Sequence, residues 1–202
     1  MPVILYVETN YLMSVAMGRE AKGDDLLAAI SLEFRVVIPS GCYMESFSAF
    51  EDEQKRRNWF KAELDKQIGQ LRRDITSGNA ASLLTTLEQS RIANDKLLND
   101  VQVRLFSVVQ QAAPVFDMLH PTHPIIHSAT TNMLIADPTD NLILHTILDH
   151  AQANPAAQKA LLTDNTKDFN TPHVTSALAA VGINKSFRNV TNVLGWLGSL
   201  KA

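Results

Sequence analysis

Five acidic side chains follow closely on predicted strands or open predicted helices: Glu8, Glu45, Asp140, Asp164 and Asp168. Carboxylates that converge within a few ångströms repel one another and raise each other's pKa unless a cation neutralises them. Oxygen ligands without cysteine or an obligatory histidine favour Mg²⁺ or Mn²⁺. Such ions activate water and stabilise an in-line displacement at phosphorus. The sequence therefore predicts a metal site for displacement at phosphorus, although each acid taken alone is more typical of a helix cap or a solvated loop.

The predicted elements would bring these acids to one edge of a sheet. Residues 3–10 form an apolar run that ends in Glu8, Thr9 and Asn10, which is typical of a buried parallel strand. A second strand at 34–38 precedes Glu45, and a third at 160–163 precedes Asp164. Ligands of open α/β sheets bind beyond the carboxyl ends of the strands. We expect the acids to meet there, with Asp140 at the start of a helix over 141–151.

The remaining pattern predicts helices over 11–17, 24–32 (capped by an aspartate), 43–50, 172–181 and 190–200, and a strand over 183–187. Between residues 51 and 113 the sequence is dense in charge of both signs and carries two long helical patterns separated by Ser77-Gly78-Asn79. The second pattern has a heptad-spaced apolar stripe, interrupted by Arg91 and Asn94. We expect an α/β domain from 1–50 and 114–202, with 51–113 as an inserted two-helix arm that packs on the domain or on a second copy.

Composition restricts the function further. The chain has 202 residues, 46% of them hydrophobic, a net charge of −3 and one cysteine, Cys42. Without a basic field, nucleic acid must be bound by a local patch or through metal ions. Cys42 excludes an internal disulfide, and no signal peptide or membrane-spanning run is visible, so we expect a soluble, cytoplasmic protein. His120, His123 and His127 lie among prolines with no cysteine nearby, which argues against zinc.

The motifs resemble those of the PIN domain family, which includes VapC-type toxins and other metal-dependent ribonucleases. They are Val7-Glu8-Thr9-Asn10, Ile38-Pro39 with Glu45 beyond, Asp140-Asn141-Leu142-Ile143 and Leu162-Thr163-Asp164-Asn165-Thr166-Lys167-Asp168-Phe169. The resemblance covers 1–50 and 135–202. It implies a three-layer α/β/α fold with a central parallel sheet and a pocket at the carboxyl ends of its strands.

Carried over by position, the resemblance makes Glu8, Glu45 and Asp140 the first three family acids. The fourth falls on Asn165 or Asp164, with Asp168 close behind. It gives catalytic roles to Glu8, Glu45, Asp140 and Asp168, metal binding to these four and Asp164, and water or substrate positioning to Asn10, Thr163 and Asn165. Two departures are visible: the first family position is normally Asp rather than Glu8, and Asn165 would remove one charge.

We therefore expect a Mg²⁺- or Mn²⁺-dependent ribonuclease acting on single-stranded or structured RNA, with an antitoxin-like protein or a second copy as further partners. Two alternatives remain open. One is a catalytically weak PIN-like module that binds RNA or protein, favoured by Glu8 and Asn165. The other is a phosphoryl-transfer enzyme with an acidic pocket, which needs an aspartate nucleophile after the first strand and a lysine on a later strand; Lys167 is the nearest lysine. The basic residues of the arm, such as Lys55 and Arg72, are more typical of a solvated helix face than of an RNA-binding face.

Overall fold

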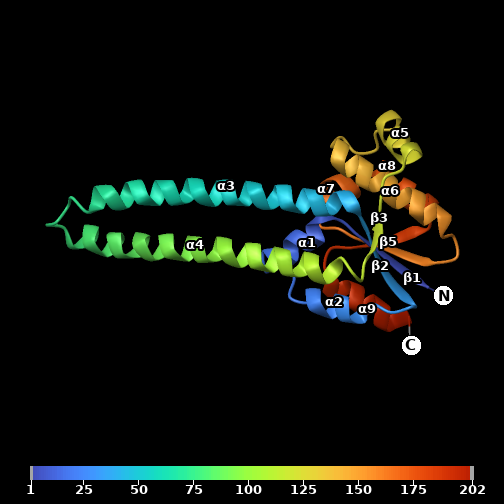
Figure 1. Ribbon diagram of the computed structural model, residues 1–202, viewed down its shortest axis with the longest axis horizontal. Helices are drawn as coiled ribbons and strands as arrows, with labels where there is room; N and C mark the ends of the chain where they lie inside the picture. The colour runs from blue at the N-terminus through green and yellow to red at the C-terminus, as the bar shows by residue number, and fades with distance from the viewer. Residues whose placement is uncertain (1, 201–202) are drawn as a thin grey trace.

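The computed structural model describes residues 2–200 and contains one parallel sheet of five strands in the order β3-β2-β1-β4-β5 (Figure 1). The strands are β1 (Val3–Val7), β2 (Phe34–Pro39), β3 (Asp117–Leu119), β4 (Gln158–Leu162) and β5 (Ile183–Phe187). β1 lies at the centre, pairs with β2 and β4, and is buried along its whole length. The apolar run beside the N-terminus is therefore the central strand of the sheet.

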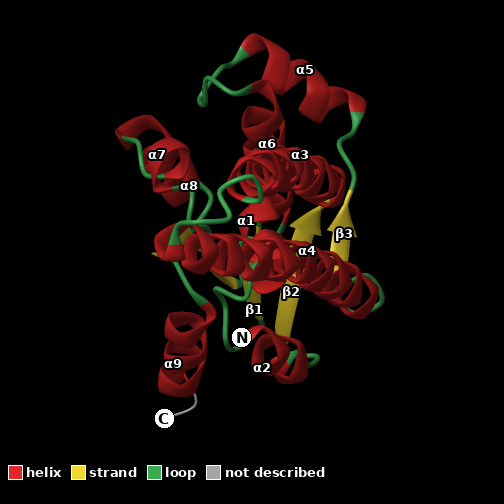
Figure 2. Cartoon of the chain, turned by 90° about the vertical axis from the view of Figure 1, so that its left-hand side faces the viewer, coloured by secondary structure: helices red, strands yellow, loops and turns green. Residues whose placement is uncertain are grey.

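Helices cover both faces of the sheet, which gives the predicted three-layer α/β/α fold. They are α1 (Thr9–Ala16), α2 (Gly23–Ala29), α3 (Ser40–Leu71), α4 (Gly78–Ala112), α5 (His123–Thr131), α6 (Pro138–Ala153), α7 (Thr166–Phe169), α8 (Pro172–Ala180) and α9 (Val190–Leu200). Figure 1 shows α2 and α9 on one side of the sheet and α6 and α8 on the other. The same figure shows α3 and α4 running side by side away from the sheet, and Figure 2 views this pair nearly end-on.

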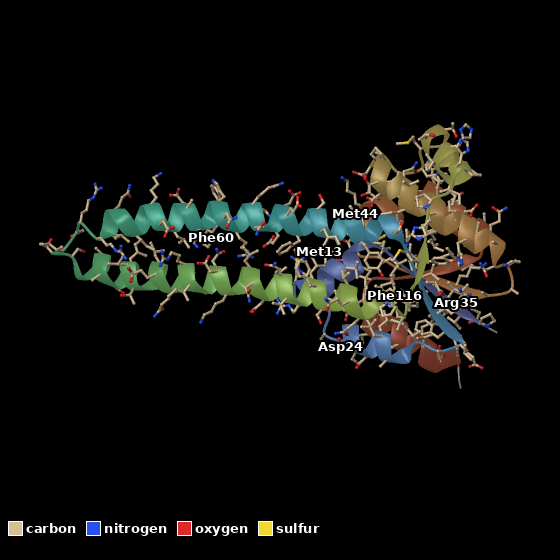
Figure 3. The ribbon with its side chains drawn as sticks, viewed as in Figure 1. Met13, Asp24, Arg35, Met44, Phe60 and Phe116 are labelled. Carbon is tan, nitrogen blue, oxygen red and sulfur yellow. The ribbon has the colours of Figure 1, made fainter. Side chains whose placement is uncertain are left out.

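The arm is a pair of antiparallel helices, and its first helix begins inside the domain. α3 is continuous over 32 residues from Ser40, directly after β2, to Leu71. Residue 51 is thus not an element boundary, and the expected separate helix at 43–50 is the base of α3. In Figure 3, Met44 lies at this base and Phe60 lies farther out on the same helix. Composition changes at Glu51 because α3 leaves the core there, whereas the helix itself continues.

The predicted apolar stripe of α4 is covered within one chain. Val101, Leu105 and Val108 are buried, and α4 packs against α3 and α1. Farther out, ion pairs join the two arm helices: Lys61–Asp95 at 2.8 Å, Arg72–Glu88 at 2.7 Å and Arg91–Asp65 at 3.2 Å. The stripe is thus buried at its domain end, whereas Leu84, Leu87 and Leu98 are only half-buried. The interhelical cations are partnered by arm acids.

Several local features differ from expectation. The 114–139 segment, for which no elements were expected, contains the edge strand β3 and helix α5. Asp24 and Asp25 lie in the first turn of α2, but neither caps it, since Lys22 occupies the cap position without a side-chain hydrogen bond. α6 begins at Pro138 with Asp137 as its cap, so Asp140 lies inside the first turn rather than opening the helix. None of the helices within residues 2–200 combines the length and apolarity needed to cross a membrane.

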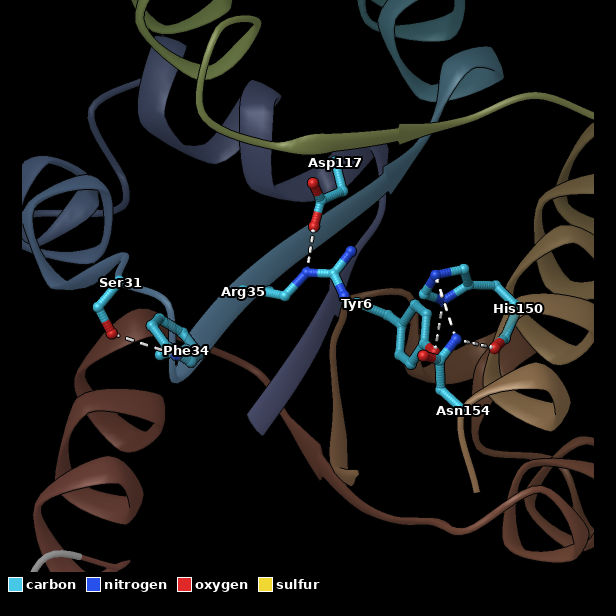
Figure 4. Close-up of polar contacts among 7 residues, drawn as sticks. All are labelled: Tyr6, Ser31, Phe34, Arg35, Asp117, His150 and Asn154. Carbon is cyan, nitrogen blue, oxygen red and sulfur yellow. Dashed lines mark hydrogen bonds and ion pairs between the residues drawn. The ribbon is translucent and has the colours of Figure 1, made fainter. Parts of the chain in front are cut away.

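Side-chain contacts fix the sheet at the end remote from the acids. Arg35 on β2 donates to Asp117 on the edge strand β3 at 2.7 Å, as Figure 4 shows. The buried Tyr6 hydroxyl lies 2.9 Å from Nδ1 of His150 on α6, and the Asn154 amide donates to the His150 carbonyl at 2.8 Å. These contacts attach β3 and α6 to the central strands. The opposite, carboxyl edge of the sheet is left for Glu8 and its neighbours.

Candidate active site

Glu8 is the innermost acid of the site. It follows β1 and caps α1, its Oε2 accepting a hydrogen bond from the Asn10 backbone N–H at 3.0 Å. The residue is only 2% exposed, and its other oxygen, Oε1, is buried without a hydrogen-bond partner. A buried carboxylate oxygen without a partner is costly. Glu8 Oε1 is also free to bind a cation or a proton.

Glu45 comes to the same edge from the neighbouring strand. β2 pairs in parallel with β1 and leads directly into α3, which carries Glu45 in its second turn. The Thr9 hydroxyl, next to Glu8 in sequence, donates a short hydrogen bond to Glu45 Oε2. This contact orients Glu45 and leaves its second oxygen available.

Asp140 is held by the structure at the start of α6. Asp137 caps this helix by accepting from the backbone N–H groups of Thr139 and Asp140 at 2.8 and 3.1 Å. The buried Asn141 fixes the preceding segment: its Oδ1 accepts from the backbone of Leu134 and Ile135 at 3.0 and 3.1 Å. Its amide donates to the Ala129 and Asn132 carbonyls at 2.7 and 3.2 Å. Asp140 is thus presented by a rigid turn.

The segment after β4 contributes polar groups with separate tasks. The Asn165 amide donates to Asp140 Oδ2 at 3.0 Å, and Asn165 Oδ1 caps α7 by accepting from the Asp168 N–H at 3.3 Å. Thr163, buried, accepts from the Asn165 N–H at 3.0 Å. Asn165 thus carries no charge but links Asp140 to the β4 end.

Asp164 is paired with an arginine from the end of β5. Its Oδ1 accepts from Nε and Nη2 of Arg188 at 3.1 and 3.0 Å, and both side chains are more than half exposed. An ion pair of this kind accounts for Asp164 without any metal. Its expected role as a ligand stays a prediction, as does that of Asp168, whose charge acts on Asp140.

The remaining acids influence one another electrostatically. Burial raises the pKa of Glu8 to about 7; the Asn10 N–H and the Thr163 hydroxyl oppose this, and the charges of Asp140 and Glu45 raise the pKa further. Burial likewise raises the pKa of Asp140 to about 6, helped by the charges of Glu45, Asp137 and Asp168. Carboxyl groups with raised pKa values at one edge indicate negative charge that lacks a counter-ion.

The oxygen donors at this edge suit a hard divalent cation, but the side chains do not surround a single position that an ion could occupy. Glu8, Glu45, Asp140 and Asp168 offer only oxygen, and the unpartnered Glu8 Oε1 is a ready ligand atom. As they stand, no three His, Cys, Asp or Glu side chains of residues 2–200 are grouped closely enough to hold an ion. His120, His123 and His127 are exposed and form no such group either. Binding would require the carboxylates to move inward.

Sequence reasoning missed three residues at this edge. Asp137 caps α6. Asn141 fixes the segment before α6 through its side-chain hydrogen bonds, and Arg188 forms the ion pair with Asp164. The Asp-Pro-Thr-Asp sequence offered two cap candidates for α6 and could have suggested Asp137, because proline is favoured directly after a cap. No sequence signal joins Asp164 to Arg188, which lies 24 positions away.

Comparison with known proteins agrees with the fold. The chain matches the PIN domain family over residues 5–169, which includes all the acids discussed and spans the arm. The chain therefore belongs to the PIN domain family, whose fold is of nuclease type and whose members typically use divalent metals. No curated protein and no solved structure matches the chain significantly.

Proposed function

We propose that this protein is a Mg²⁺- or Mn²⁺-dependent ribonuclease that hydrolyses RNA phosphodiester bonds at the carboxyl edge of its sheet. The observation that carries the proposal is the buried, unpartnered Oε1 of Glu8 beside Asp140 and Glu45, which raise the pKa of Glu8. An uncompensated acidic edge of this kind is expensive in a structural scaffold and useful in a metal-dependent enzyme. Membership of the PIN domain family supports the same reaction class.

Each residue then has a definable task. Glu8, Glu45, Asp140 and Asp168 would supply oxygen ligands, with Glu8 Oε1 the deepest of them. When bound, a divalent ion would provide a nucleophilic hydroxide near neutral pH and neutralise charge that develops on the phosphate. Thr9 orients Glu45, and Asn165 orients Asp140. Thr163 and Asn10 lie beside them and would position water or the phosphate.

A second candidate is a PIN-like module that binds RNA or protein with little hydrolysis. It is favoured by a specific observation: Glu8 Oε2 is engaged in capping α1, and no three acids within 2–200 are grouped for an ion. Phosphoryl transfer through an aspartate nucleophile finds less support, because Glu8 stands after β1 and Lys167 is exposed on α7 rather than on a strand. The buried lysine on β4, Lys159, lies near the start of that strand and donates to the Val181 carbonyl at 2.8 Å. An antitoxin-like partner stays an expectation.

The test is cleavage of labelled single-stranded RNA with Mn²⁺, with Mg²⁺ and with EDTA, alongside a phosphate monoester. We expect metal-dependent cleavage of RNA only. Asp140→Asn should reduce the rate by about 10²-fold or more, because it removes a ligand oxygen. Asp100→Asn, at an exposed arm position, is the matched control and should cleave normally. RNA binding without cleavage under all conditions would favour the second candidate; cleavage unaffected by Asp140→Asn would refute the metal site.

A further inference from the structure

An acidic edge cannot by itself bind a polyanion. A divalent ion offsets part of the charge of Glu8, Glu45 and Asp140, but the phosphates flanking the cleaved bond need cations from the protein. The arm's interhelical cations, Lys61, Arg72 and Arg91, are occupied by arm acids. The question is therefore which cation at the sheet edge can reach RNA.

Arg188 lies at that edge because β5 ends beside the end of β4. The Phe187 carbonyl accepts from the Thr163 N–H at 2.9 Å, so the residue after Phe187 emerges next to Thr163 and Asp164. The next turn is fixed as well, since Glu20 Oε2 accepts from the Val190 N–H at 2.8 Å. The backbone of Arg188 is thus anchored on both sides.

A small hollow connects Arg188 with the candidate active site. Its volume is about 20 Å³, room for one water-sized group such as a phosphate oxygen. Its lining includes Asn10 and Thr163 from the site, Ser14, and the Asp164–Arg188 pair. Glu20 also contributes, but its two carboxylate oxygens already accept from the Val190 and Lys22 backbone N–H groups. The hollow is therefore an extension of the site on the β5 side.

The Asp164–Arg188 ion pair is suited to exchange. Both contacts from Arg188 fall on one oxygen, Asp164 Oδ1, and the Arg188 side chain is 68% exposed. Exposed pairs contribute little to stability, so a phosphate can replace or share the Asp164 partner at small cost. A guanidinium has five N–H donors in a fork that matches phosphate, so donors remain available.

We propose that Arg188 binds an RNA phosphate flanking the cleaved bond and thereby directs the strand over the β5 side of the site. The inference rests on the proposed function for its substrate. Asp164, instead of binding metal, holds the guanidinium in place until RNA arrives. Asp164 and Arg188 together make a substrate-positioning pair at this edge.

The experiment measures the affinity of a fluorescent single-stranded RNA in EDTA, as a function of salt. Arg188→Ala should weaken binding roughly fivefold and reduce the slope of log affinity against log salt by about 0.7, the value for one lost phosphate contact on a single strand. Arg188→Lys should recover part of the affinity. Asp164→Asn should strengthen binding, with a smaller gain when Arg188 is already alanine. Arg73→Ala, an equal charge change at the arm tip, is the control and should change neither quantity.

A second measurement identifies the phosphate. A neutral methylphosphonate linkage is moved along the RNA one position at a time. One flanking position should weaken wild-type binding but leave the Arg188→Ala protein unaffected. Equal affinity and slope for wild type, Arg188→Ala and Arg73→Ala would overturn the inference, even if Mn²⁺-dependent cleavage is normal and the proposed function stands. A dependence on Arg188 in a protein that never cleaves RNA would support Arg188 as an RNA-phosphate contact and reject the nuclease. Failure of wild type to bind RNA would overturn both.

Discussion

The side-chain amide of Asn165 donates a hydrogen bond to Oδ2 of Asp140 at 3.0 Å. At the position where an acid was expected, the protein thus has a donor that fixes the third acid. An amide in place of a carboxylate means one negative charge fewer at this edge, where the pKa of Asp140 is already raised to about 6. It also orients Asp140 towards the end of β4.

Replacing Asp140 by Asn should stabilise the metal-free protein by ~1 kcal/mol. The substitution keeps an oxygen for Asn165 and removes a charge that is disfavoured first by burial and then by the neighbouring carboxylates. The gain corresponds to about one pKa unit once solvent screening of this half-buried group is allowed for. In millimolar Mn²⁺ the order should reverse, because ion binding to the folded state stabilises the wild type more. Thermal melts of both proteins, in EDTA and in Mn²⁺, give the comparison. Equal shifts would identify Asp140 as an ordinary first-turn residue.

Stability in EDTA should fall as the pH rises from about 4.5 to about 7. Burial gives Glu8 a pKa of about 7 in the folded protein, against an ordinary value of 4.5, so the folded state holds an extra proton throughout this interval. The stabilisation from this proton is complete below pH 4.5 and is lost as the pH rises through 7. The free energy of unfolding falls by about 3 kcal/mol over this range. Urea unfolding at pH 5 and pH 7.5 measures the difference. The Glu8→Gln protein should show a clearly smaller difference in unfolding free energy between the two pH values. An identical pH dependence in both proteins would mean that Glu8 does not titrate in this range.

Asn141→Ala should destabilise the protein by about 3 kcal/mol. The substitution leaves two backbone N–H groups and two carbonyls without their side-chain partner, in a site where Asn141 is 1% exposed. Chemical denaturation reports the loss, and hydrogen exchange should accelerate first in α5. Asn99→Ala, on the exposed surface of α4, serves as the control and should cost less than about 0.5 kcal/mol. Similar values for the two variants would show that water replaces the Asn141 network.

Asn94→Leu should stabilise the arm by about 1 kcal/mol. Asn94 is buried in the stripe of α4; its amide donates to the Arg57 carbonyl at 3.3 Å, but its Oδ1 has no partner. A polar residue at such a position costs stability and specifies helix register. Urea unfolding measures the gain, and light scattering checks whether the variant associates. A destabilised variant would mean that the Arg57 contact outweighs the unpartnered oxygen.

The fold was predictable where burial dictates pattern. The Val3–Val7 run reads as a central strand because both its faces are covered, and parallel strands necessarily bring Glu8, Glu45 and the end of β4 to one edge. β3 was not predictable, because its three residues, with intermediate or exposed side chains, become a strand only by pairing with β2.

The site was predictable in position but not in detail. Which of Asp137 and Asp140 caps α6 depends on the local turn, and two neighbouring acids beside Pro138 give the same sequence signal. The rotation of Asp164 towards Arg188 depends on where β5 ends, which is a tertiary property. Likewise, the change of composition at Glu51 marks where α3 leaves the domain and says nothing of where the helix stops.

The continuity of α3 has a mechanical consequence. Glu45 and the arm tip belong to one helix of 32 residues, about 48 Å long, with no loop between them. Because Glu45 lies on the same helix as the arm and is hydrogen-bonded to Thr9 at the start of α1, a tilt of α3 relative to α1 would change the distance between Glu45 and Glu8. A partner bound at the far end of the arm would therefore have a direct mechanical connection to the acidic edge.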